Sequence, residues 1–292
     1  YILLAKTPSR YIIQCSPLIV GFFAVIAGKI RKKEIILNVS DLWPRAGLEM
    51  NILNKGRYYD ILLYIEKYLY NNSDKIIGQS IEIMKHIKNI VSDKQKPTFL
   101  YRNYPVFDKF SIKSKNKDNK IKIVYAGLIG VAQGIESIIE NVQFPDKIEF
   151  HIYGDGPLSG KVKSLCENKS LIKYHGIVKR DELHEILLNF DATLIPLKNR
   201  IYGSVPSKIF EYSKLGLPII YFSDGEGADL IEKYKLGITQ RQIDYNSLEK
   251  KLEKLSIGKI KLPTKKEVQN TAFQNFDNQK QFIEFRKQIL TQ

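Results

Sequence analysis

The sequence lacks the features that mark several special classes of protein. Its two cysteines, Cys15 and Cys166, stand far apart and outside any Cys-x-x-Cys or Cys/His cluster, so neither a disulfide scaffold nor a zinc site is expected. A reducing compartment fits such low cysteine usage. The longest apolar run, 17–28, is about 12 residues, short of the roughly 20 needed to span a membrane. No charged n-region with a small-residue cleavage site is present, so we expect no signal peptide.

The composition is that of an ordinary folded chain. Of the 292 residues, 43% are hydrophobic and 26% charged, which excludes a disordered or collagen-like protein. At about 150 residues a domain, this length predicts roughly two domains.

Positive charge is in excess and unevenly placed. The chain has 46 basic and 31 acidic residues, a net +15. Residues 1–120 include 21 basic and 10 acidic residues, a net +11. Residues 121–292 include 25 basic and 21 acidic residues, a net +4. A basic first half indicates an anionic partner, either nucleic acid, a membrane surface or a phosphorylated substrate; a Lys-, Ile- and Asn-rich composition explains it equally well. The lysines are scattered and no nucleic-acid-binding motif is visible, so we expect no nucleic-acid partner.

Strand and helix patterns alternate along the chain, which predicts parallel α/β domains. A polar, aperiodic segment at 108–120 is typical of a linker. The sequence therefore predicts one domain at 1–112, a second at 113–277, and a final helix at 278–292 that packs back towards the first. In open parallel sheets, ligands bind beyond the carboxyl ends of the strands.

Two glycine turns follow predicted strands in the second domain. The first, 126–134, contains Gly127, Gly130 and Gly134, which allow a ligand to approach the backbone closely before a helix whose free N–H groups suit an anion. A tight turn without a ligand explains this pattern equally well. The second, 154–157, reads Gly-Asp-Gly-Pro and makes a sharp turn.

A third block, 205–218, is the most informative. Pro206 suits a helix start, which places Ser207 and Lys208 in the first turn, where N–H groups and a cation can hold phosphate. Glu211 lies one turn later on the same face and can accept two hydrogen bonds from a ribose diol. The alternative is a Lys–Glu surface pair.

Five blocks in order resemble bacterial glycosyltransferase family 4, and most of all its O-antigen and capsule branch, which includes L-fucosamine transferases. They are 14–18, 39–44, 126–134, 154–157 and 206–218. The resemblance implies a GT-B fold, an α/β architecture of two Rossmann-like domains with parallel sheets facing a cleft, and a first domain shortened at its N terminus.

The resemblance also implies a function. It implies a retaining, metal-independent transfer of a sugar from a nucleotide diphosphate sugar, with UDP favoured, to a lipid-linked saccharide in surface polysaccharide synthesis. It places the enzyme in the cytoplasm, peripheral at the inner face of the cell membrane, with an anionic membrane surface as partner. Neither cofactor nor metal is expected, and the Asp-x-Asp motif of metal-dependent transferases is missing. A nucleotide-sugar epimerase of the same fold and an inactive partner subunit remain as alternatives.

Carried over by residue, the resemblance gives Asp41 and Lys208 catalytic roles. The residues that it assigns to the nucleotide sugar are Gly127, Gly130, Gln133, Gly134, Asp155, Ser207, Lys208 and Glu211. Four positions depart from the family pattern: Ser40, Leu128, Gln133 and Gly203 stand where many members have His, Arg, Lys and Glu. The histidines His86, His151, His175 and His184 are expected to be structural, with His175 the candidate for a base pocket.

Overall fold

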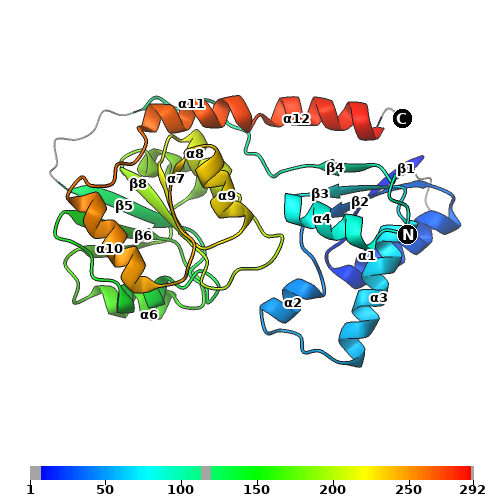
Figure 1. The fold of residues 1–292 in the computed structure, drawn as a ribbon, viewed down its shortest axis with the longest axis horizontal. Coiled ribbons are helices and arrows are strands. Elements are labelled where there is room, and N and C mark those ends of the chain that lie inside the picture. Colours follow the sequence, from blue (N-terminus) through cyan, green and yellow to red (C-terminus); the bar gives the residue numbers. More distant parts are fainter. Residues whose placement is uncertain (1–7, 113–119, 291–292) are drawn as a thin grey trace. The chain divides into compact units, whose positions relative to one another are not determined.

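The computed structural model describes residues 8–112 and 120–290, which form two compact units (Figure 1). The first unit contains the residues up to Asn103, the short segment Ile201–Val205, and the residues from Asn278 onward. The second contains Tyr104–Arg200 and Pro206–Asp277.

The chain passes from one unit to the other between Asn103 and Tyr104, earlier than the predicted boundary at 112. The reason is aromatic packing: the ring centroid of Tyr104 lies 5.0 Å from that of Phe210 and 5.5 Å from that of Phe276. The start of the predicted linker is therefore part of the second unit, and its residues 113–119 lie outside the described residues.

The first unit is built on a four-stranded parallel sheet of order β1-β2-β3-β4. Its strands are β1 (Arg10–Gln14), β2 (Glu34–Val39), β3 (Lys75–Gly78) and β4 (Thr98–Leu100). Its helices are α1 (Leu18–Ile30), α2 (Arg45–Glu49), α3 (Arg57–Asn72) and α4 (Ile81–Ile90). The β2 side chains Ile35, Leu37 and Val39 are fully buried against these helices, as expected of a central parallel strand.

The C-terminal segment completes this unit. Helix α12 (Asn278–Phe285) runs into a π-helical turn (Arg286–Leu290). Phe285 and Ile289 form a small core with Ile36, Ile77 and Phe99 from the strands. The Gln281 side chain also bonds the backbone of Arg102, with 2.9 Å to both its N–H and its carbonyl oxygen. The last helix is thus held by apolar burial and by hydrogen bonds from the Gln281 side chain to the backbone of Arg102.

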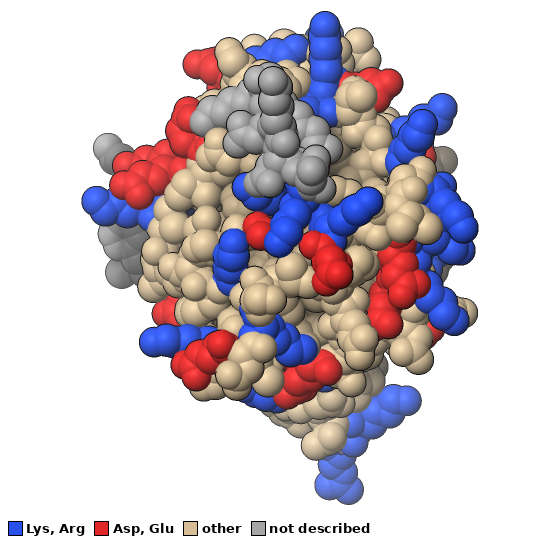
Figure 2. Space-filling model, turned by 90° about the vertical axis from the view of Figure 1, so that its left-hand side faces the viewer, with Lys and Arg blue, Asp and Glu red and all other residues tan. Residues whose placement is uncertain are grey.

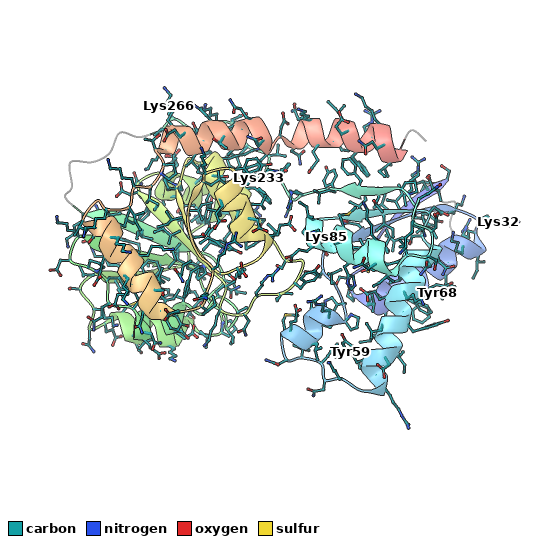
Figure 3. All side chains as sticks on the ribbon, viewed as in Figure 1. Lys32, Tyr59, Tyr68, Lys85, Lys233 and Lys266 are labelled. Atoms are coloured by element: carbon teal, nitrogen blue, oxygen red, sulfur yellow. The ribbon has the colours of Figure 1, made fainter. Side chains whose placement is uncertain are left out.

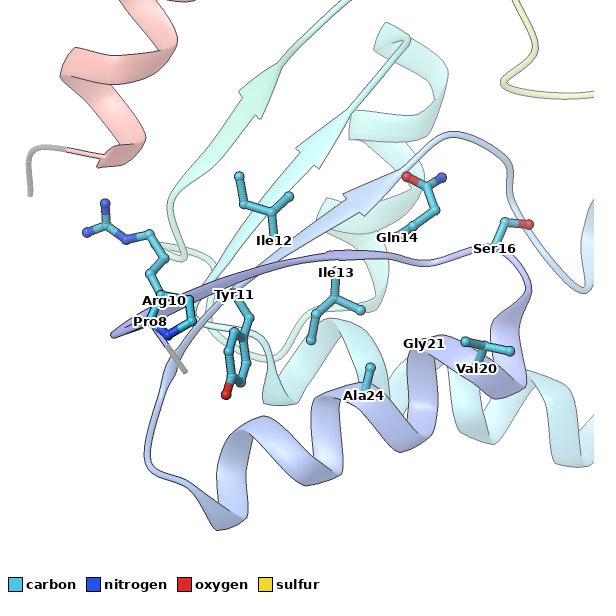
Figure 4. A pocket seen from close by; sticks show the side chains of 10 residues that line it. All are labelled: Pro8, Arg10, Tyr11, Ile12, Ile13, Gln14, Ser16, Val20, Gly21 and Ala24. Atoms are coloured by element: carbon cyan, nitrogen blue, oxygen red, sulfur yellow. The ribbon is translucent and has the colours of Figure 1, made fainter. Parts of the chain in front are cut away.

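A pocket of about 460 Å³ lies beside β1 and α1 (Figure 4). Ile12 and Ile13 of β1 and Val20, Gly21 and Ala24 of α1 line it. Among the described strands β1 pairs only with β2, so the pocket lies along an open sheet edge. None of the sequence-predicted site residues lines this pocket.

The second unit is built on a six-stranded parallel sheet of order β10-β9-β8-β5-β6-β7. Its strands are β5 (Ile121–Ala126), β6 (Ile148–Tyr153), β7 (Ile172–Gly176), β8 (Ala192–Pro196), β9 (Ile219–Phe222) and β10 (Gly237–Gln240). Its helices are α5 (Ile135–Asn141), α6 (Ser159–Cys166), α7 (Arg180–Leu187), α8 (Lys208–Lys214), α9 (Glu226–Lys233), α10 (Tyr245–Ser256) and α11 (Lys265–Asn275).

The strand order places a topological switch point between β5 and β8. From β5 the sheet grows through β6 and β7 on one side and through β8, β9 and β10 on the other. Chain connections leave in opposite directions at such a point, which opens a crevice beyond the strand ends. The glycine turn at 126–134 follows β5, and the segment leading to α8 follows β8. The sheet topology therefore brings the predicted binding blocks together.

The surface of the second unit carries both signs of charge. The face turned to the viewer in Figure 2 shows Lys and Arg side chains mixed with Asp and Glu. This agrees with the composition of that unit, whose residues 104–200 and 206–277 include 27 basic and 22 acidic residues, a net +5. Across the described part of the chain, no helix is long and apolar enough to cross a membrane.

Candidate functional site

The carboxyl ends of β5 and β6 carry two turns that pack backbone against backbone. The Ile129 N–H donates to the Asp155 carbonyl oxygen (2.8 Å), and the Gly127 N–H donates to the Tyr153 carbonyl oxygen (3.0 Å). Gly154 has a φ of +129°, and a Cβ there would lie 1.8 Å from the Gly127 carbonyl oxygen. Only glycine permits this approach, so Gly154 fixes the shape of the first turn.

Lys208, the first residue of α8, lies across the turn that follows β5. Its ammonium donates to the Ala126 carbonyl oxygen, which also accepts the Tyr212 hydroxyl at 2.8 Å. A Cβ at Gly127 would lie 1.7 Å from Lys208 Nζ, so the bare glycine makes room for the cation. The ammonium also lies 4.8 Å from the ring centroid of Tyr125. The fold thus fixes a cation at the turn where the sequence predicts a diphosphate.

The surroundings of Lys208 lower its affinity for a proton. Burial lowers the pKa of the Lys208 ammonium to about 8, and the nearby Glu211 carboxylate opposes part of that shift. A bound anion would favour the charged form and raise this pKa again. An anionic ligand at this place would therefore stabilise the charged form of Lys208.

Glu211 lies one helical turn after Lys208 and contacts a histidine. Its Oε1 is 2.8 Å from Nε2 of His184, which belongs to α7. The His184 ring lies 4.8 Å from the ring centroid of Phe107 and 5.6 Å from that of Phe110. The Glu211 side chain remains 28% exposed, so a ligand can still reach its carboxylate.

The other predicted glycine-turn residues lie where the sequence places them. Gly134, with a φ of +64°, precedes α5, and a Cβ there would lie 2.8 Å from Cβ of Lys198. Gln133 Oε1 is buried and, within residues 8–112 and 120–290, finds no hydrogen-bond partner. A Cβ at Gly130 would lie 2.9 Å from that oxygen. Ser207 is exposed and precedes α8 without a side-chain capping bond.

The Asp155 carboxylate is directed to its own turn. Hydrogen bonds from the Ser159 hydroxyl and the Gly156 N–H lower the pKa of the fully exposed Asp155 carboxyl. Its backbone carbonyl, as described above, supports the neighbouring glycine turn. These contacts give Asp155 a role in shaping the site, and its predicted contact with a nucleotide sugar stays a prediction.

Asp41 belongs to the first unit, just beyond the carboxyl end of β2. The Asn38 amide donates to Gln14 Oε1 (2.7 Å), and the Gln14 amide donates to Ser40 Oγ (2.7 Å). The Ser40 hydroxyl then donates to Asp41 Oδ2 (3.1 Å). Ser40, which stands where many family members have histidine, thus orients this exposed carboxylate.

Sequence reasoning missed two side chains of the candidate site. His184, which the sequence leads us to expect to be structural, contacts Glu211, and Tyr212 shares the Ala126 carbonyl oxygen with Lys208. Both partners lie far from these residues in the sequence, so no spacing pattern could have revealed them. Over the described ranges, no group of three or more His, Cys, Asp or Glu side chains could hold a metal ion.

The other histidines have partners of their own. His86 contacts the buried Glu66 at 2.8 Å. His151 Nδ1 lies 2.9 Å from His175 Nε2, and the His175 ring stacks on Tyr153 at 4.3 Å. The place of His175 in a base pocket stays a prediction.

Solved structures share this fold at low sequence identity. The crystal structure of Anabaena HepE in complex with UDP matches with a TM-score of 0.74 and 15% identity, over 93% of this chain and 76% of that one. The lipopolysaccharide outer core galactosyltransferase WaaB matches with a TM-score of 0.70 and 16% identity, over 96% and 75%. Sucrose-phosphate synthase from Thermosynechococcus elongatus matches with a TM-score of 0.70 and 15% identity, over 91% and 70%.

The similarity to a curated plant protein extends over a smaller part of the chain. Protein EDS1 of Arabidopsis thaliana is 26% identical over 137 residues, which is 46% of this chain and 22% of that protein. The chain therefore spans only about a fifth of the length of the curated relatives it matches.

The family described as "Glycosyl transferases group 1" matches residues 106–273, more than half of the chain. The match contains both glycine turns, Lys208, Glu211 and His184. The predicted fold class is confirmed by the two parallel α/β units and by the glycosyltransferase structures above. The chain therefore belongs to the glycosyl transferases group 1 family and has its GT-B fold.

Proposed function

We propose that the protein transfers a sugar from a UDP-sugar to a lipid-linked saccharide, with retention of anomeric configuration and without a metal. The observation that carries the proposal is the cluster at the ends of β5 and β8. There, Lys208 lies over a glycine turn and Glu211 follows one helical turn later. A cation beside a glycine turn suits the diphosphate of a nucleotide sugar, and the carboxylate suits its ribose.

Solved structures of similar fold support UDP as the nucleotide. The HepE structures contain UDP or UDP-glucose, and a TarM structure from S. aureus also contains UDP. Gly203 stands where many family members have a glutamate that they direct to hydroxyls of the donor sugar, so this chain would hold the sugar by other groups. The Gly203 N–H donates to Glu82 Oε2 at 2.8 Å, and both residues belong to the first unit.

In the proposed reaction, positive charge develops at the anomeric carbon of the sugar and negative charge develops on the leaving diphosphate. The bond from C1 of the sugar to the diphosphate oxygen breaks, and its electron pair stays on the diphosphate. An acceptor hydroxyl forms the new bond to C1 on the same face and loses its proton. In this proposal Lys208 and the turn at 126–134 stabilise the leaving diphosphate, which is the largest electrostatic demand. Asp41 acts on the acceptor side, where its carboxylate can take up the hydroxyl proton.

A lipid-linked acceptor would bring the enzyme to a membrane surface, and we propose a peripheral position at its cytoplasmic face. The basic segment after α1 supports this: Lys32 is exposed and extends from the turn (Figure 3), with Arg31 and Lys33 beside it. Lys29 contributes less, because its ammonium pairs with Asp74 at 3.0 Å. O-antigen or capsule synthesis is the proposed setting.

The test is transfer that depends on an acceptor. Purified protein is incubated with UDP-sugars, with and without polyprenyl-diphosphate-linked saccharide, and the products are identified by mass spectrometry and NMR. We expect UDP release and a glycosidic bond of retained configuration only when acceptor is present, and no change with EDTA. Conversion of UDP-sugar without acceptor would favour the epimerase alternative, and inverted product or a need for added metal would contradict the proposed mechanism.

A further inference from the structure

The contact between His184 and Glu211 joins two helices at the candidate site. Glu211 Oε1 and His184 Nε2 are 2.8 Å apart, although the residues belong to α8 and α7. With a hydrogen on Nε2, His184 donates to the carboxylate. A carboxylate has about four acceptor positions, so one bond to His184 leaves capacity for a diol.

The histidine is itself held in place from the other side. Phe107 and Phe110, which follow the crossing point between the units, lie 4.8 and 5.6 Å from its ring. The Gln269 amide donates to the Phe110 carbonyl oxygen at 2.9 Å and fixes that segment. The imidazole therefore has a defined orientation before it meets Glu211.

We propose that His184 is a positioning residue that orients Glu211 for the ribose of the nucleotide. The proposal rests on the proposed function, in which Glu211 accepts the ribose hydroxyls. An unrestrained glutamate loses side-chain freedom when it binds a ligand, and a partner that holds its rotamer beforehand reduces that loss. His184 thus acts through Glu211 and needs no contact with the nucleotide.

A purely structural role fits the exposure of this pair less well. The side chains of His184 and Glu211 are 20% and 28% exposed, and partly exposed ion pairs contribute little to folding stability. Neither residue is buried, so the contact does not belong to the core of the unit. Its expected effect is therefore on ligand selectivity rather than on folding.

The test compares binding of UDP with binding of 2′,3′-dideoxy-UDP by isothermal titration calorimetry. His184→Leu keeps apolar contact with the phenylalanines but removes the donor, and His184→Gln keeps a side-chain N–H. We expect the wild-type protein to prefer UDP by about tenfold or more, His184→Leu to lose most of that preference, and His184→Gln to recover it to within about threefold. Melting temperatures control for folding, and His184→Asn, too short to reach Glu211, replaces the Leu variant if that does not fold.

A double-mutant cycle separates this inference from the proposed function. In a Glu211→Ala background, His184→Leu should cause no further loss of UDP affinity, because its effect passes through the missing carboxylate. A wild-type preference that survives in His184→Leu would overturn the positioning role alone. A wild-type protein that binds both nucleotides equally, with Glu211→Ala unchanged, would overturn the ribose role of Glu211 and the positioning role with it.

Discussion

The two units present very different strand ends to a ligand. In the second unit, glycines at positive φ bring two turns into backbone contact, and a half-buried lysine is fixed over one of them. In the first unit, the side chains of Asn38, Gln14, Ser40 and Asp41 form a hydrogen-bonded polar row at the carboxyl ends of β1 and β2. The family match covers 106–273, which lies within the range of the second unit apart from Ile201–Val205. The closely packed strand ends are thus the ones that the family match covers, as expected if family members share the nucleotide and differ in the acceptor.

We expect the largest loss of stability from a side chain added where the two glycine turns touch. Gly154→Ala would place a Cβ 1.8 Å from the Gly127 carbonyl oxygen at a φ of +129°. We expect a loss of at least about 3 kcal/mol in the free energy of unfolding, measured with urea. Gly160→Ala is the control, because a Cβ at Gly160 meets nothing within 4 Å and that residue lies in α6. Equal stability of the two variants would contradict the backbone packing described.

Removing the carboxylate of Glu211 should weaken nucleotide binding next most. Glu211→Ala should cost about 1.5–3 kcal/mol of UDP binding free energy, the scale of hydrogen bonds to a charged group. Asp41→Asn, in the first unit, should leave UDP affinity unchanged while it lowers transfer. Isothermal titration calorimetry measures the UDP affinity of both variants. If Asp41→Asn weakens UDP binding as much as Glu211→Ala does, the two units do not divide the roles in this way.

The titration of Lys208 predicts a pH dependence of binding. Its pKa is about 8 in the folded protein, so the free site is mostly charged at pH 7 and mostly neutral at pH 9. If only the charged form binds the diphosphate, UDP affinity should fall about twofold from pH 7 to pH 8 and about tenfold from pH 7 to pH 9. Lys208→Met should bind more weakly and show no such fall. A wild-type affinity that stays level to pH 9 would remove Lys208 from the diphosphate site.

Loss of a single surface charge should have the smallest effect and should differ between the units. Near an anionic bilayer each lysine contributes on the order of 1 kcal/mol and is screened by salt. Lys32→Ser should weaken the free energy of binding to anionic vesicles, measured by sedimentation, by about 1 kcal/mol. Lys266→Ser in the second unit should leave it unchanged (Figure 3). Equal effects, or binding to neutral vesicles that ignores salt, would contradict an electrostatic contact through the first unit.

The sequence predicted the elements well where local signals were strong. The largely apolar run at 121–126 is typical of a strand and the apolar spacing at 81–91 is typical of a helix, and β5 and α4 lie there, with the Ser80 side chain accepting from the Ile83 N–H as the cap of α4. The pair Ser16-Pro17 is also typical of a helix start with Ser16 as its cap, but Pro17 occupies the capping position of α1, which begins at Leu18. The residue types alone could not predict where α1 begins, because the backbone before it is held by the pairing of β1 with β2, which continues to Cys15.

The candidate site was predictable only in part. The turns and the Lys208–Glu211 spacing are local patterns, and they lie at the switch point of the sheet as expected. The shared Ala126 carbonyl, the His184 contact and the tight approach of Gly154 to Gly127 arise from packing between distant segments. The same holds for Tyr104, whose packing on Phe210 and Phe276 moves the boundary between the units.

We propose that Lys208 and the glycine turn hold the diphosphate of the donor without a metal. The most direct measurement is calorimetric titration of wild-type protein and Lys208→Met with UDP and with UMP, all in EDTA. We predict that wild-type protein binds UDP at least about tenfold more tightly than UMP, and that Lys208→Met loses most of that difference. Equal affinity of wild-type protein for UDP and UMP, or a preference for UDP that needs added Mg²⁺, would contradict the account.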